Sequence, residues 1–74
     1  MPSSVIRFHR YAPDRRELTV TFVSGRVYVY EGVPAELAAA FRDVRSKGTF
    51  FNRQIRDRYA CRDITREYSD PAGP

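Results

Sequence analysis

The fold is decided by residues 17–31, which read ELTVTFVSGRVYVYE. Residues 17–23 predict a half-buried strand, because polar and apolar side chains alternate from Glu17 to Phe22. The apolar face of that strand carries Leu18, Val20 and Phe22. Ser24 and Gly25 follow as a hairpin signal, and residues 26–31 alternate Val and Tyr, which suit a pleated surface. This stretch therefore predicts an antiparallel β-hairpin.

The residues before the hairpin predict a further strand. Residues 4–11 mix apolar and basic side chains at roughly alternate positions. Residues 12–16 form the connection, because Pro13 presets one backbone dihedral and Asp14 favours turn conformations. Three strands with short connections predict an antiparallel meander.

After the hairpin the apolar period changes from two residues to that of a helix. Pro34 precedes a run of strong helix formers at 35–44, and its missing N–H is tolerated at the start of a helix. One face of this predicted helix carries Leu37, Phe41 and Val44. Gly48 is available to end it, and a second helix is predicted over about 49–59. Its apolar stripe consists of Phe51, Ile55 and Tyr59. Residues 60–65 fit either an extended segment or a continuation of that helix.

The predicted fold class is therefore α+β, a three-stranded antiparallel β-meander followed by two α-helices packed on one face. A chain of 74 residues is one small domain. A single cysteine excludes an internal disulfide and a cysteine-cluster metal site within one chain. The first residues lack the basic and apolar regions of a signal peptide, and no stretch approaches the ~20 apolar residues that span a bilayer. We expect a cytoplasmic protein without a membrane partner and without a cofactor.

Positive charge concentrates in residues 42–58. This segment holds six basic and two acidic residues, a net charge of +4, which equals the formal charge of the whole chain. Lys47 and Gly48 directly precede the second predicted helix, whose free N–H groups and positive dipole end favour an anion. The predicted nucleic-acid-binding residues are Arg45, Lys47, Gly48, Arg53 and Arg56. The alternative for this segment is a solvated helix face beside an ordinary inter-helix turn.

Four other residues were candidates for binding or chemistry. Tyr28 and Tyr30 lie two apart on a strand, so both rings project from one face, either as a stacking platform for bases or as part of the core. His9 and Cys61 are the one pair that could form a thiolate and its base, but neither belongs to a supporting motif. The acidic residues form no recognisable acid–base pair, and a single His supports no metal site. We therefore expect a protein that is not an enzyme.

Several short motifs, taken in order, resemble the KTSC family, a domain named for its place at the C-terminus of some lysyl-tRNA synthetases. The matching residues are Ser3-Ser4-Val5-Ile6, Tyr28-Val29-Tyr30, Gly32-Val33-Pro34, Ser46-Lys47-Gly48, Phe51-Asn52, Ile55-Arg56 and Tyr59. The resemblance implies a KTSC-like domain over residues 3–65, and the composition of the end of the chain predicts a flexible C-terminal tail over residues 66–74. It implies a small domain found alone or attached to larger enzymes, with no established activity and with nucleic-acid binding as a suggestion.

The functional expectation is a small non-catalytic binding module that contacts nucleic-acid backbone, with RNA favoured over DNA. The alternative is a module for protein–protein interaction or self-association without nucleic-acid binding. In that alternative the contact surface is the sheet face opposite the helices, which bears Thr19, Thr21 and Val29. Salt dependence separates the two, because phosphate binding weakens steeply with salt and apolar docking hardly does.

Overall fold

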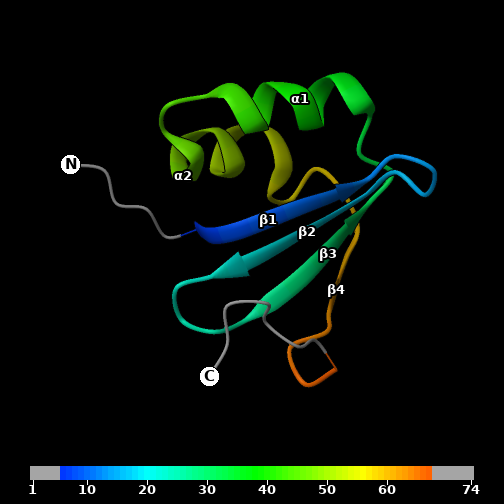
Figure 1. Cartoon of the computed structure of the whole chain (residues 1–74), viewed down its shortest axis with the longest axis vertical. Coiled ribbons are helices and arrows are strands. Elements are labelled where there is room, and N and C mark those ends of the chain that lie inside the picture. The colour runs from blue at the N-terminus through cyan, green and yellow to red at the C-terminus, as the bar shows by residue number, and fades with distance from the viewer. Residues whose placement is uncertain (1–5, 68–74) are drawn as a thin grey trace.

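The computed structural model describes residues 6–67. Figure 1 shows a four-stranded antiparallel sheet with the helices gathered on one side of it. The strands occur in the order β1 (Ile6–Ala12), β2 (Glu17–Phe22), β3 (Val27–Glu31) and β4 (Cys61–Asp63). Between β3 and β4 come α1 (Ala35–Asp43), α2 (Lys47–Phe50) and a π-helical turn, η1 (Phe51–Ile55), that continues α2.

The predicted meander is confirmed for β1, β2 and β3. β2 pairs with β3 from Glu17 opposite Glu31 to Thr21 opposite Val27. The turn that joins them contains Gly25 with φ of 96°, a left-handed conformation that glycine adopts without steric cost. The N–H of Gly25 donates to the carbonyl of Phe22 at 2.9 Å. The alternation of β2 and the small residues of its turn thus set this hairpin locally.

The sheet has four strands where the sequence predicted three. Cys61–Asp63 pairs antiparallel with β3, with Cys61 opposite Tyr30. The pairing is extended by the N–H of Glu31, which donates to the carbonyl of Ala60 at 2.8 Å. β4 is short and exposed, so its own side chains do not mark it as a strand. It forms because it satisfies the hydrogen-bonding groups along the otherwise open edge of β3.

The second helix begins and ends earlier than predicted. It starts at Lys47 and its π-helical turn ends at Ile55, whereas the sequence predicted about 49–59. The N–H of Arg56 donates to the carbonyl of Phe51 at 2.8 Å, five residues back, which is π-helical bonding. Asp57 then adopts a left-handed conformation with φ of 64°, which Asp tolerates better than most residues. This turn redirects the chain from the helix into β4.

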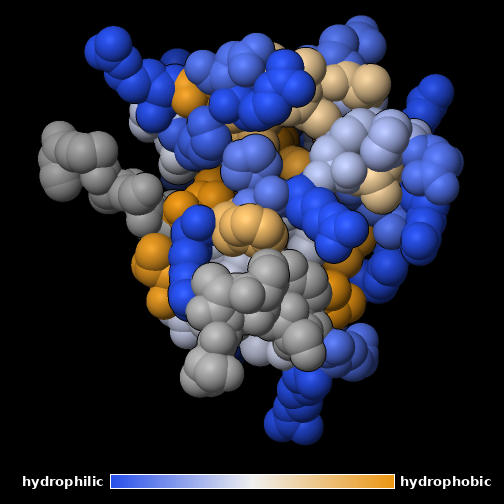
Figure 2. Space-filling view, in the orientation of Figure 1, coloured by the Kyte–Doolittle hydropathy of each residue, from blue (hydrophilic) through white to orange (hydrophobic). Residues whose placement is uncertain are grey.

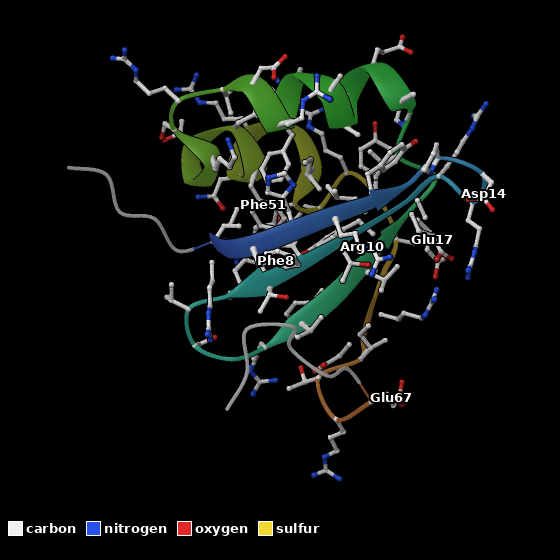
Figure 3. The ribbon with its side chains drawn as sticks, viewed as in Figure 1. Phe8, Arg10, Asp14, Glu17, Phe51 and Glu67 are labelled. Carbon is white, nitrogen blue, oxygen red and sulfur yellow. The ribbon has the colours of Figure 1, made fainter. Side chains whose placement is uncertain are left out.

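The core lies between the helices and the sheet. Figure 3 shows Phe51 in this layer, while Phe8 and Arg10 project from the opposite face of β1. The buried cluster contains Ile6, Leu18, Val20, Tyr30, Val33, Ala38, Phe41, Phe51 and Ile55. Leu37 and Tyr59 pack partly buried against it. The predicted stripes are thus confirmed for Leu37, Phe41, Phe51 and Ile55, while Val44 and Tyr59 lie beyond the ends of their helices. Helices on one face, as predicted, are therefore confirmed.

A β-bulge in β1 sends Phe8 away from this core. The register shifts between Ile6 and Phe8, so Ile6 joins the core while Phe8, two residues later, is 39% exposed on the other face. In a regular strand residues two apart share a face. The bulge inserts one extra residue and thereby breaks that rule.

The sheet face opposite the helices is less open than predicted. Thr21 and Val29 are only 2% and 4% exposed. Val29 lies opposite Arg62 of β4, whose guanidinium contacts the carboxylates of Glu31 at 2.6 Å and Glu17 at 3.6 Å. These exposed ion pairs add little energy, but they hold the Arg62 side chain across this face. The expectation that Thr21 and Val29 offer an uncovered docking surface is therefore wrong.

The C-terminal boundary is visible only in part. Arg66 and Glu67, the first residues of the predicted tail, belong to a turn in which the N–H of Glu67 donates to the carbonyl of Ile64 at 2.9 Å. The remaining tail residues, and residues 3–5 of the predicted domain, lie outside the described residues.

The two tyrosines of β3 should differ in their contribution to stability. Tyr30 is 5% exposed and packs edge-on against Phe51, whereas Tyr28 is only half-buried. We expect Tyr30→Ala to lower the free energy of unfolding by about 3–5 kcal/mol, and Tyr28→Ala by about half as much because less of its surface is buried. Urea melts of both variants measure the difference. Equal losses would contradict this assignment.

Tyr30 should also make the fold sensitive to alkaline pH. Burial, followed by the Cys61 thiol and Tyr28, raises the pKa of Tyr30 to about 12 from the usual 10.0. The neutral phenol is thus favoured in the folded state. Its stabilising effect is complete below pH 10 and is lost as pH rises toward 12, with a loss of about 1.4 kcal/mol by pH 11.

Urea melts at pH 8 and pH 11, on the wild-type chain and on Tyr30→Phe, measure this loss. Tyr30→Phe keeps the ring and removes the ionisable hydroxyl, so it should lose less stability than the wild type between the two pH values. The same loss in both proteins would assign the alkaline sensitivity to other groups.

Candidate functional site

An open groove of about 640 Å³ lies on the helix side of the sheet, bounded by the β2–β3 turn, the end of the second helix and β4. We call it the aromatic groove. Its aromatic lining consists of Phe22, Tyr28, Tyr30, Phe51 and Tyr59. Its polar and charged lining consists of Ser24, Arg26, Asn52, Arg56, Asp57 and Cys61, and Val23 completes it. Ligand sites in proteins commonly occupy about 300–1,000 Å³, so the groove has the size of a binding site.

The rings of the aromatic groove hold one another in place. Phe22 packs edge-on against Tyr28 and Phe51, with ring centroids 5.8 and 5.4 Å apart. Tyr30 packs against Phe51 at 5.3 Å in the same manner. Edge-to-face contacts at these distances are favourable beyond the area they bury. The result is a continuous aromatic wall that joins β2 and β3 to the second helix.

The structure separates the two roles that the sequence left open for Tyr28 and Tyr30. Tyr30 belongs to the buried core and, with Phe51, forms the inner part of the aromatic groove. Tyr28 is half-buried, as are Phe22 and Tyr59, so these three rings keep part of their surface toward the groove. Both tyrosines are structural, and Tyr28 can also contact a ligand.

Arg56 supplies positive charge at the aromatic groove. Its guanidinium lies 3.5 Å from the side-chain oxygen of Asn52, one turn earlier on the helix. Among residues 6–67 no carboxylate lies within ion-pair distance of Arg56. The second groove arginine, Arg26, is instead paired with Asp63 at 3.3 Å. Arg56 is therefore the groove cation whose charge is available to a ligand.

Lys47 has a structural position that the sequence did not indicate. Its ammonium donates to the carbonyls of Arg42 at 2.9 Å and Val44 at 3.0 Å, and lies 6.0 Å from the ring centroid of Phe41. A cation that bonds the last carbonyls of a helix satisfies groups with no intrahelical partner. Two of the three ammonium donors are thus engaged in joining α1 to α2. That Lys47 also contacts phosphate stays a prediction.

The other predicted binding residues do not form one cluster. Gly48 is half-buried in the first turn of α2, and Arg45 and Arg53 are exposed with no ion pair among the described residues. Arg56 lies nine positions after Lys47, roughly 13 Å along a helix axis. The structure therefore spreads these residues from the α1–α2 connection, which holds Arg45, to the end of the second helix, and brings only Arg56 to the aromatic groove.

Sequence reasoning missed the groove itself. Phe22 was assigned to the core, and Asn52 was noted only as part of a motif. The spacing of Asn52 and Arg56, four residues apart on a helix, was the signal that they share a face. The association of those residues with β3 and β4 depends on tertiary packing and has no local signal.

The geometry excludes the His9–Cys61 pair as a catalytic dyad. His9 is on β1 and Cys61 on β4, the two outer strands of the sheet, which are roughly 14 Å apart at the usual strand spacing. His9 packs edge-on against Phe41 at 4.8 Å, and burial, followed by the charge of Lys47, lowers its pKa. Cys61 is exposed in the aromatic groove beside Tyr30.

Two further searches concern residues 6–67 only. No helix in this part of the chain is long and apolar enough to cross a membrane. Nor does this part bring together three or more His, Cys, Asp or Glu side chains in a group able to hold a metal ion.

Two known proteins are similar to this chain in sequence. A protein of Stutzerimonas stutzeri (strain A1501), described as uncharacterized, is 36% identical over 59 residues, which cover 80% of this chain and 83% of that protein. A lysine–tRNA ligase of Nostoc sp. (strain PCC 7120) is 34% identical over 62 residues, 84% of this chain but only 11% of the ligase.

A solved structure and a family match agree with these relatives. The crystal structure of a KTSC domain protein from Yersinia pestis superposes with a TM-score of 0.79 at 36% identity, covering 86% of this chain and 93% of that one. Residues 2–59 match the family described as the KTSC domain. The chain belongs to the KTSC domain family.

Proposed function

We propose that this KTSC domain is a non-catalytic module that binds nucleic-acid backbone through the arginines of its second helix and of the residues flanking that helix. The supporting observation is that Arg45, Arg53 and Arg56 are exposed and have no ion pair among residues 6–67. Arginine forks match phosphate geometry with two parallel hydrogen bonds. Hydrophilic side chains project around the periphery of the molecule in Figure 2, where phosphates could reach them.

The charges of the segment favour these arginines over Lys47 as phosphate contacts. The Arg42 guanidinium lies 3.1 Å from the carboxylate of Asp43, so that pair is internally neutral. The Lys47 ammonium already bonds two carbonyls. Arg45, Arg53 and Arg56 are therefore the residues that we expect to contact phosphate. Arg58 donates to the carbonyl of Arg53 at 2.9 Å, which supports the same surface.

RNA is the first ligand to test. The Nostoc relative is a lysine–tRNA ligase, whose name specifies an RNA substrate, and the matched region is a small part of that protein. Six of the residues that carry the family resemblance line the aromatic groove. They are Tyr28, Tyr30, Phe51, Asn52, Arg56 and Tyr59. Phosphate contacts bring affinity without sequence choice, so we expect binding that is nearly independent of sequence.

A protein-interaction module is the second candidate function. It is favoured by Phe8 and Val23, two large apolar side chains that are exposed. Phe8 lies on β1, an outer strand of the sheet, and outer strands can pair with another chain. This interaction would change little with salt, because it would depend on apolar contact and backbone pairing.

Binding of a short labelled single-stranded RNA should weaken with salt. With about three phosphates neutralised, the logarithm of the affinity should fall with the logarithm of the salt concentration at a slope of about −2. Arg53→Ala and Arg56→Ala should each weaken binding and reduce that slope by roughly 0.7. Fluorescence anisotropy across a salt series measures these changes, and a DNA strand of the same sequence compares the two nucleic acids.

Two variants act as controls. Arg15→Ala removes an exposed arginine from the β1–β2 turn and should leave the affinity and the slope unchanged. Lys47→Ala should lower the free energy of unfolding by about 1 kcal/mol, because two carbonyls lose their donor, with a smaller effect on the slope than Arg56→Ala. Equal losses from Arg15→Ala and Arg56→Ala, or no binding at about 50 mM salt, would contradict the proposal.

A further inference from the structure

We infer that the aromatic groove receives one unpaired nucleobase, with the adjoining phosphate at Arg56, so that the ligand of this domain is single-stranded rather than duplex. This inference rests on the proposed function and adds the class of nucleic acid and the site of its base. Two features of the groove carry it, the exposed ring surface of its wall and the charge at its mouth.

The wall offers ring surface that is already in place. Phe22 contacts both Tyr28 and Phe51 edge-on, so the wall is held by its own contacts before a ligand arrives. Tyr28 and Tyr59 are half-buried and line the groove from β3 and from the turn before β4. A preorganised surface loses little side-chain freedom on binding. Each base has a flat face that stacks on such rings irrespective of its identity.

The mouth of the groove suits an anion beside a hydrogen-bonding edge. The guanidinium of Arg56 has no carboxylate within ion-pair distance among residues 6–67, and its neighbour within 3.5 Å is the side-chain oxygen of Asn52. The Asn52 amide carries both donors and an acceptor, which match the polar edge of a base. Arg56 offers parallel donors to a phosphate. Asn52 and Arg56 can thus bind the two polar parts of one nucleotide, the edge of the base and the phosphate.

Duplex nucleic acid cannot use this arrangement. In a duplex the faces of the bases are covered by stacking and their Watson–Crick edges by pairing, so protein rings stack on a base only where the strand is unpaired. The phosphates of a duplex would still reach Arg45 and Arg53. The groove therefore predicts a preference for single strands over duplexes beyond the electrostatic attraction that both share.

The rival occupant is an aromatic side chain of a protein partner, which would fill the same wall. The charge of the groove argues against it. Arg26 is neutralised by Asp63, and the other charged residues that line the groove are Arg56 and its chain neighbour Asp57. These two are not within ion-pair distance of each other, so the Arg56 guanidinium can still pair with an anion. Beyond the groove, Arg45 and Arg53 are exposed and have no ion pair among residues 6–67. An anionic ligand with a flat apolar part complements both features.

Cys61 provides a built-in reporter for the test. It is exposed, it lines the aromatic groove, and it is the single cysteine of the chain. An occupied groove should shield its thiol, so the rate of reaction with a disulfide reagent such as DTNB measures occupancy. A saturating single-stranded RNA of about eight nucleotides should slow this reaction at least threefold. The same sequence as a blunt duplex should leave the rate within about 20% of that of the unliganded protein.

The decisive variants exchange one ring while keeping apolar volume. Tyr59→Leu should weaken single-strand binding roughly tenfold, within the range for loss of one base–aromatic stack, and should abolish the protection of Cys61. Tyr59→Phe keeps the ring and should restore both. Phe8→Leu is the matched control, because Phe8 is an exposed ring on the opposite face of the sheet. It should bind as the wild type does, and urea melts check that all three variants are folded.

Two results would overturn the inference while leaving the proposed function in place. One is equal affinity for single strand and duplex without protection of Cys61, with Arg53→Ala and Arg56→Ala still weakening binding. The other is equal weakening by Tyr59→Leu and Phe8→Leu. Protection of Cys61 by a phenylalanine-containing peptide but by neither nucleic acid would overturn the inference in favour of the protein partner. Absence of any nucleic-acid binding at about 50 mM salt would overturn both proposals.

Discussion

The contact of Phe51 with the rings of the sheet is the interaction on which the rest of the domain depends. Phe51 packs edge-on against Phe22 of β2 and Tyr30 of β3, and it is buried. It is also the first residue of the π-helical turn. So small a chain buries a limited core, and these three rings join its two layers. The position of the second helix, the direction of the following turn and the wall of the aromatic groove all follow from this contact.

The π-helical turn connects that packing to the surface. The extra residue in its hydrogen-bonded ring ends the helix after Ile55, and Asp57 reverses the chain into β4. Phe51 and Ile55 are buried, while Asn52 and Arg56, each one residue later, are exposed at the groove. π-helical turns are rare and frequently occur at functional sites. In this domain the π-helical turn buries Phe51 and Ile55 in the core and exposes Asn52 and Arg56 at the groove.

Charge in this domain is divided between structural and available groups. Lys47, the one lysine of the chain, bonds the end of α1, and Arg62 bridges Glu17 and Glu31 across the sheet. The arginines of the second helix keep their guanidinium groups in solvent. The net charge of the chain therefore overstates the number of positive groups that a ligand can contact. The distinction depends on which carbonyls and carboxylates lie nearby, and those are set by the fold.

Much of the architecture was predictable because its signals are local. Alternation over residues 17–22, the turn at Gly25 and the break at Pro34 each depend on neighbours in the chain, and the hairpin and α1 form where they indicate. The helix-period stripe that includes Phe51 and Ile55 also identified the buried face of the second helix. For the site, sequence identified the basic segment and the shared face of the two β3 tyrosines.

Only the tertiary structure decided the remaining features, because each depends on residues distant in sequence. β4 has exposed side chains and forms through the edge of β3. The bulge that exposes Phe8 depends on the register of β1 against β2. The Lys47 ammonium donates to two carbonyls at the end of α1, a contact that no residue pattern in the sequence indicates. The aromatic groove joins β2, β3, the second helix and β4, and a cavity made by four elements has no signature in any one of them.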